Sequence, residues 1–198
     1  MSELELMAQL GALLRPDEPV EELFRSFPGS GRFHSGLMPD LATYGALKAP
    51  EAGLFVEYDG HPCHQQRYGD KRDRAKNAAL LSLAPDSWVV RISHGDRQPM
   101  GRNVLSVKVN FWQGESDQSL TRTLSEVIQQ MLSGLRSELD PGVALRLLQH
   151  QASNRLCPKA KEFAEAALRD CRIRAKSPHD ASQETPGPPR PARSYANL

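Results

Sequence analysis

The chain has 198 residues, of which 39% are hydrophobic and 25% are charged, and its formal net charge at pH 7 is +1. This balance predicts a water-soluble protein with one buried core plus appendages, and it excludes a polycation that binds nucleic acid through its overall charge. No apolar stretch is long enough for a membrane span, so we expect no membrane partner.

The cysteines and the N-terminal residues bear on the cellular compartment. Cys63, Cys157 and Cys171 are odd in number and include no closely spaced pair, which argues against a disulfide framework and for a reducing environment. The first residues carry acidic side chains where a signal peptide would carry basic ones. We therefore expect an intracellular protein, without distinguishing cytoplasm, nucleus or organelle.

The first elements in chain order are two short helices, over residues 2–14 and 19–27, separated by Arg15-Pro16-Asp17. Acidic residues in the first turn of the second helix support its assignment. A glycine-rich segment ends this helix, and a short strand is expected over 37–44. The N-terminal part is therefore predicted to form two helices followed by a strand.

A stronger strand is expected over residues 53–59, where an apolar run ends in two acidic residues. Between 65 and 83 apolar residues recur near helical spacing among many basic ones, which predicts a long helix. Strands over 87–92 and, more weakly, over 104–109 follow. The strand, helix, strand order predicts a parallel pair crossed by a helix, and so an α/β core.

Beyond residue 116 the hydrophobic spacing becomes helical, and we expect packing helices over 116–172 as an extension of a core that spans 1–115. Residues 173–198 are rich in proline and polar side chains, and we expect this tail to be disordered. The tail is a candidate binding segment for a protein partner, whereas the oligomeric state has no sequence indicator.

The strand over 53–59 carries the most informative pattern. Side chains alternate faces along a strand, so Phe55, Glu57 and Asp59 share one side. Two carboxylates on one face of a strand end repel each other unless a cation or a basic group lies between them. We interpret this pattern as a divalent metal site.

Five short motifs occur in a fixed order along the chain: Pro39-Asp40, Glu57-Tyr58-Asp59-Gly60, His64, Asp73-Arg74-Ala75-Lys76 and Val89-Val90-Arg91. In their order and spacing they resemble the PD-(D/E)XK nuclease superfamily, in particular the branch typified by the very short patch repair endonuclease and its homing-endonuclease relatives. The resemblance covers roughly residues 20 to 110, about half of the chain.

The resemblance implies a restriction-endonuclease-like core, a mixed sheet flanked by helices, that hydrolyses phosphodiester bonds in DNA with Mg²⁺ or Mn²⁺. It implies metal ligation by Asp40 and Asp59, with catalytic roles for Asp59, His64, Asp73 and Glu57; Glu22 could match an acidic residue that some relatives place on the preceding helix. Carboxylates that hold Mg²⁺ and a histidine that titrates near neutral pH suit phosphodiester hydrolysis. The basic residues expected to hold phosphates are Arg67, Lys71, Arg72, Arg74, Lys76 and Arg91.

Two positions depart from the pattern. The superfamily places a lysine two residues after its second acid, where this chain has Asp59, and the branch often has an aromatic residue before the histidine, where this chain has Cys63. An alternative function is therefore a catalytically inactive nuclease-fold module that binds nucleic acid or a protein partner. A further alternative is a regulator whose α/β unit supports the C-terminal helices.

Single residues also have structural explanations. Asp59-Gly60 and Pro39-Asp40 occur in ordinary turns. An aspartate near a lysine on a helix, such as Asp73, can form a solvated ion pair, and Arg91 can pair with a nearby acid. The functional interpretation thus depends on the order and spacing of the motifs together.

Overall fold

A computed structural model describes residues 3–18, 38–60, 67–96, 100–110 and 117–176. The expected helix over 19–27 with Glu22, the residue His64, and the tail from 177 onward lie outside the described residues. Contacts divide the chain into two compact units, Met1–Glu165 and Ala166–Leu198. The packing described below belongs to the first unit.

The centre of this unit is a four-stranded mixed sheet in an α/β arrangement. Its strands are β1 (Leu41–Tyr44), β2 (Gly53–Asp59), β3 (Trp88–Ser93) and β4 (Val104–Lys108), in the order β1-β2-β3-β4. β1 runs antiparallel to β2, whereas β2, β3 and β4 are mutually parallel. The expected parallel pair crossed by a helix is confirmed by β2, α3 and β3.

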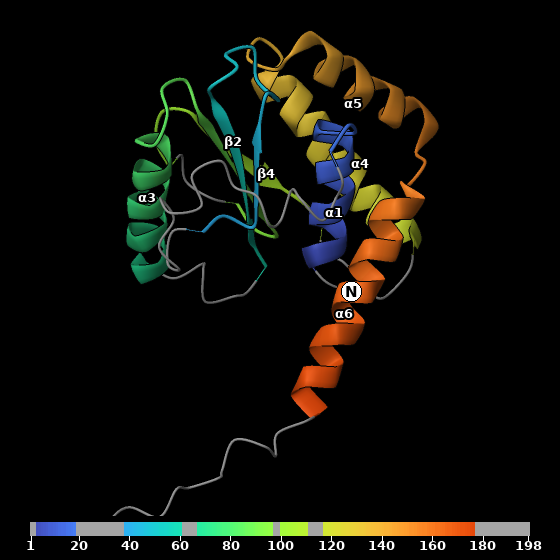
Figure 1. Cartoon of the computed structure of the whole chain (residues 1–198). Helices are drawn as coiled ribbons and strands as arrows, with labels where there is room; N and C mark the ends of the chain where they lie inside the picture. The colour runs from blue at the N-terminus through green and yellow to red at the C-terminus, as the bar shows by residue number, and fades with distance from the viewer. Residues whose placement is uncertain (1–2, 19–37, 61–66, 97–99, 111–116, 177–198) are drawn as a thin grey trace, which may run out of the picture. The chain divides into compact units, whose positions relative to one another are not determined.

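The described helices are α1 (Glu3–Leu14), α3 (Arg67–Leu81), α4 (Asp117–Leu135), α5 (Pro141–Ser153) and α6 (Pro158–Lys176). Figure 1 shows α3 on one side of the sheet and α1 and α4 on the other. α6 continues to Lys176, past the expected boundary of the tail at residue 172. Among the described residues, no helix combines the length and apolar character that a membrane span requires.

The ends of two elements differ from the expected ones for local reasons. Pairing in β1 begins at Leu41, later than expected, because Pro39 has no N–H and the side chain of Asp40 accepts the N–H of Tyr58 in place of a backbone carbonyl. The α3 helix ends at Leu81, where the chain tightens and the N–H of Leu83 donates to the carbonyl of Leu80.

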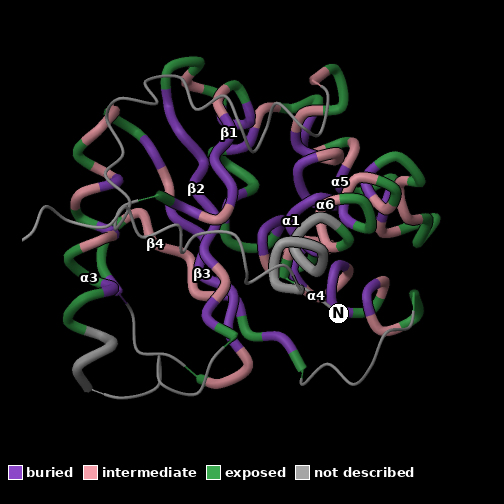
Figure 2. The backbone as a smooth tube through the Cα atoms, turned by 60° about the horizontal axis from the view of Figure 1, so that its bottom comes forward, coloured by how far each residue is buried: buried purple, intermediate pink, exposed green. Residues whose placement is uncertain are grey.

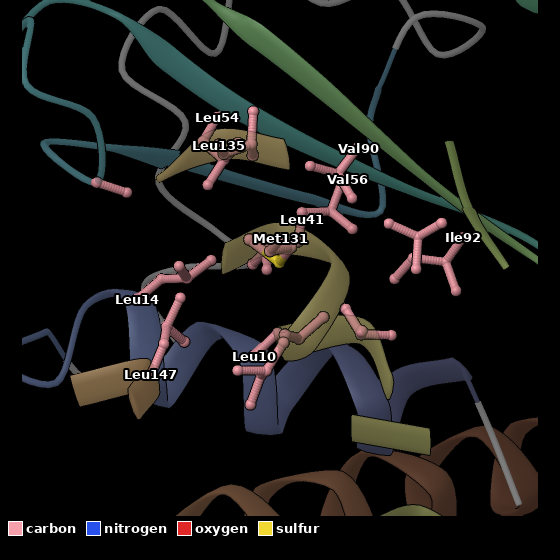
Figure 3. Packing of buried hydrophobic residues seen from close by; sticks show 14 of the residues in the cluster. Leu10, Leu14, Leu41, Leu54, Val56, Val90, Ile92, Met131, Leu135 and Leu147 are labelled. Carbon is pink, nitrogen blue, oxygen red and sulfur yellow. The ribbon is translucent and has the colours of Figure 1, made fainter. Parts of the chain in front are cut away.

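The two faces of the sheet bury different clusters. Leu54 and Val56 of β2 belong to the main core, which they share with residues of β3, α1 and α4, as Figure 3 shows. Phe55 points to the other face and packs with Val89 and with Leu80 of α3. Both faces are therefore covered, and Figure 2 marks most of β2 and β3 as buried.

The helices after residue 116 complete the main core. Leu124, Ile128 and Met131 of α4 and Leu147 of α5 lie in the same hydrophobic cluster as the sheet residues. Asp140 caps α5 by accepting from the N–H groups of Gly142 and Val143. The helices α4 and α5 thus pack against the sheet in the main core.

Candidate functional site

The acidic residues singled out by the sequence gather where β2 ends, between the beginning of β1 and the adjoining face of α3. Glu57 and Asp59 lie on the β2 face that α3 covers and are only 5% and 6% exposed. On α3, Asp73, Lys76 and Asn77 are spaced three and four residues apart and so share one side of the helix. Two groups of contacts form between these side chains.

The first group centres on Lys76. Its Nζ atom donates to Oε2 of Glu57 at 2.7 Å and to the carbonyl of Met38 at 2.9 Å. Oε1 of Glu57 also lies 2.7 Å from this ammonium, yet it receives no well-directed hydrogen bond from the described residues. Burial raises the pKa of Glu57 to about 7; Lys76 opposes the rise and the charge of Asp40 adds to it.

Two further carboxyl groups adjoin Glu57. Oδ2 of Asp40 accepts the N–H of Tyr58 at 2.7 Å, and the side chain of Glu3, in the first turn of α1, hydrogen-bonds to Asp40. Desolvation raises the pKa of Glu3 to about 7, with further contributions from Asp40, Glu57 and Asp59. We call Glu3, Asp40, Glu57 and Lys76 the lysine cluster.

The second group centres on Arg91 of β3, which is 1% exposed. Its Nε and Nη2 atoms donate to Oδ2 and Oδ1 of Asp59 at 2.8 and 2.6 Å, and Nη1 donates to Oδ1 of Asn77 at 2.8 Å. Nη2 also lies 3.1 Å from Oδ1 of Asp73. Desolvation lowers the pKa of Arg91, but the contacts with Asp59 and Asp73 outweigh it and the net pKa is raised. We call these four residues the arginine cluster.

The contacts in the arginine cluster differ from the roles expected for Asp59 and Arg91. Both carboxylate oxygens of Asp59, expected as a metal ligand, are engaged by the Arg91 guanidinium. Arg91 was expected among the phosphate-binding residues, but its buried guanidinium is occupied by Asp59, Asp73 and Asn77. These contacts agree with the alternative explanation of Arg91, the pairing of a nearby acid.

The expected basic residues of α3 fall into two classes. Lys71, Arg72 and Arg74 are exposed on the helix surface. Lys76 instead points inward to the lysine cluster and is 19% exposed at its side chain. The side chain of Arg67, like the whole of His64, lies outside the described part of the chain.

A metal ion was the expected cofactor, and the donor set can be tested for it. Within the described residues, no three His, Cys, Asp or Glu side chains are arranged to hold a metal ion. Mg²⁺, however, commonly takes only one or two protein carboxylates and completes its shell with water and substrate phosphates. Asp40 and Glu57 fit a site of that kind, because the two charges repel and Oε1 of Glu57 lacks a directed donor.

Two features of this region were not predicted from the sequence. Glu3 reaches Asp40 from a distant helix, and no local motif marks it. The hydroxyl of Tyr58 lies 2.6 Å from Nε2 of His94, whose Nδ1 lies 3.2 Å from the carbonyl of Asn110. Because a carbonyl only accepts, Nδ1 carries the hydrogen and the Tyr58 hydroxyl donates to Nε2. This series of hydrogen bonds connects the ends of β2, β3 and β4.

The site combines buried carboxylates, a lysine that contacts one of them and exposed cations on the adjoining helix. No family model, curated protein or solved structure matches the chain.

Proposed function

We propose that the chain is a restriction-endonuclease-like protein that hydrolyses phosphodiester bonds of DNA with Mg²⁺ or Mn²⁺. One observation carries the proposal: the Nζ atom of Lys76 lies 2.7 Å from Glu57 and 2.9 Å from the carbonyl of Met38, two residues before Asp40. The motifs that resemble the nuclease superfamily contain a first aspartate, a second acid and a lysine. Here the lysine would come from α3 instead of from β2.

The mixed sheet with a helix on each face agrees with the fold that the resemblance implies. Asp40, the first acid, precedes the strand that pairs antiparallel with β2, and Glu57, the second acid, lies near the end of β2. The two acids therefore approach each other across one strand pair. This arrangement supports a restriction-endonuclease-like fold but is not unique to it.

In the proposed reaction Asp40 and Glu57 would hold the cation, and Lys76 would donate a hydrogen bond to a non-bridging oxygen of the scissile phosphate. A bound Mg²⁺ would supply charge neutralisation at the phosphate and an acidified water. The ammonium of Lys76 acts by electrostatic stabilisation, which is strongest in a partly desolvated site. Lys71, Arg72 and Arg74, exposed on the same helix, bind flanking phosphates.

The proposal is tested by nicking of supercoiled plasmid DNA in Mg²⁺. Lys76→Met and Glu57→Gln should each reduce the rate by roughly 100-fold or more, because each removes a group that contacts the phosphate or the cation. The matched control is Lys108→Met, which removes an exposed lysine paired with Asp96 at 2.9 Å. Equal nicking by wild type, Lys76→Met and Glu57→Gln would refute the proposal.

The structure also favours a second candidate, a nuclease-fold module that binds nucleic acid without cutting it. Its support is the engagement of Asp59 by Arg91, together with the exposed cations of α3. Calorimetry separates the two candidates: Mg²⁺ or Mn²⁺ binding that is lost in Glu57→Gln favours hydrolysis. DNA binding that persists without any metal binding favours the silent module, and replacement of Lys71, Arg72 and Arg74 by glutamine should then abolish it.

A further inference from the structure

We propose that Arg91 is a positioning residue that fixes α3 against the sheet and thereby sets the ammonium of Lys76 beside Glu57. The inference rests on the proposed function, in which Lys76 contacts the scissile phosphate. It assigns Asp59 a role different from metal ligation, namely holding the Arg91 side chain in place.

The contacts of Arg91 on α3 flank Lys76. Its Nη1 atom donates to Asn77 at 2.8 Å, and its Nη2 atom lies 3.1 Å from Asp73. Asp73 and Asn77 are one helical turn apart, and Lys76 lies between them in sequence and on the same side of the helix. Arg91 therefore fixes both the position and the rotation of the turn that carries Lys76.

The other end of Arg91 is fixed in the sheet. The bidentate contact with Asp59 holds the guanidinium plane in one orientation, since both parallel N–H groups must meet one carboxylate. In the β2 and β3 register, Arg91 lies directly beside Glu57. The strand pair, the guanidinium and one turn of α3 thus form a closed set of contacts that defines where Lys76 meets Glu57.

The composition of α3 explains why such a fixing contact is needed. Leu80, one turn beyond Lys76, packs with Phe55 and Val89 and holds the C-terminal half of the helix. Around Lys76 the helix is polar: besides the contact of Lys76 with Glu57, it meets the sheet through the contacts of Asp73 and Asn77 with Arg91. A lysine side chain has four rotatable bonds, and a misplacement of about 1 Å in a reacting group can lower a rate roughly 100-fold.

The first experiment needs neither metal nor DNA. The folded protein is trace-labelled with acetic anhydride, and peptide mass spectrometry gives the ratio of acetylation at Lys76 to that at Lys71, an exposed lysine of the same helix. Arg91→Lys keeps the charge but cannot hold Asp59 and Asn77 together. The ratio should rise several-fold in Arg91→Lys and stay at the wild-type value in Val107→Ala, a core substitution in β4 that controls for lost stability.

The second experiment measures plasmid nicking in Mg²⁺. Arg91→Lys should lower kcat roughly 10-fold to 100-fold with KM nearly unchanged, because it displaces a group that acts on the reacting phosphate. In a Lys76→Met background, Arg91→Lys should cause no further loss. An unchanged acetylation ratio in folded Arg91→Lys, or rate losses that multiply in the double variant, would overturn the positioning role.

A milder variant covers the case in which Arg91→Lys does not fold. Asn77→Ala removes one acceptor of Arg91 and leaves the contact with Asp59 intact. It should raise the acetylation ratio in the same direction by a smaller factor, and an unchanged ratio contradicts the inference. If the wild-type protein fails to nick DNA, the proposed function fails, while the acetylation ratios still decide whether Arg91 positions Lys76.

Discussion

At the residue scale, the buried carboxylates differ in the cation that each one faces. Asp59 contacts a guanidinium through both oxygens, whereas Glu57 contacts a single ammonium and keeps one oxygen without a directed donor. Replacing Asp59 by alanine would leave a buried charge with too few partners, at a cost of about 3 kcal/mol. Loss of activity in Asp59→Ala would therefore not by itself indicate metal ligation.

The raised pKa of Glu57 predicts a pH-dependent stability. Its pKa is about 7 in the folded chain against 4.5 for the unperturbed group, so the unfolded chain releases this proton first as the pH rises. The free energy of unfolding should fall between pH 5 and pH 8, by roughly 2 kcal/mol from this residue. Glu3, whose pKa is also raised to about 7, contributes in the same direction.

Urea unfolding at pH 5 and pH 8 measures this effect. In Glu57→Gln the difference in unfolding free energy between the two pH values should shrink by roughly 2 kcal/mol, because the glutamine does not titrate. Glu51→Gln, at an exposed position, should keep the wild-type difference. A difference that is the same in Glu57→Gln and wild type would contradict the assignment.

At the element scale, connections far from the site determine how helices join the sheet. The turn after β1 pairs with the connection between α4 and α5: Lys48 donates from its N–H to the carbonyl of Glu138, and Asp140 donates to that of Ala46. Asp140 also begins α5, where Pro141 follows the cap. One short segment thus both starts a helix and holds it to the sheet.

The cap of α5 gives a prediction for this connection. Asp140→Ala removes the acceptor of the N–H groups of Gly142 and Val143 and should lower the free energy of unfolding by about 1 kcal/mol. Asp140→Asn keeps a side-chain oxygen and should change stability much less. Thermal or urea unfolding of the two variants measures the difference, and equal losses would show that the cap contributes little.

At the scale of the whole molecule, the sheet and the C-terminal helices share one core. Leu124, Ile128 and Met131 of α4 are fully buried against residues of α1, β2 and β3. Truncating one such side chain to alanine costs about 2 to 5 kcal/mol, against a typical total stability of about 5 to 15 kcal/mol. The helices after residue 116 are therefore part of what keeps the sheet folded.

Two truncations test this dependence. A chain that ends after Glu165 keeps the first compact unit and should unfold cooperatively. A chain that ends after Glu115 loses α4 and α5 and should lack a cooperative transition, because ten of the 24 buried residues of the described main core are missing. Circular dichroism during thermal unfolding distinguishes them, and a cooperative transition in the shorter chain would show that the sheet folds without these helices.

Much of the fold follows from local sequence patterns. The bounds of β2 agree with the expected strand over 53–59, and Phe55, Glu57 and Asp59 share one buried face, because alternation along a strand depends only on neighbouring residues. The helical spacing after residue 116 likewise indicated the later helices. The strand expected over 37–44 is present as β1, but its later start at Leu41 could not be predicted, since it depends on a side-chain contact with β2.

Local sequence patterns predict the chemistry of the site only in part. The sequence indicates which acidic residues lie at the end of β2 and that they need a cation or a basic partner. The contacts of Lys76 with Glu57 and of Arg91 with Asp59 become visible in the folded structure, as does the approach of Glu3 to Asp40. The physical reason is that these partners lie 19 residues or more away in the chain and meet only when helix and sheet pack together.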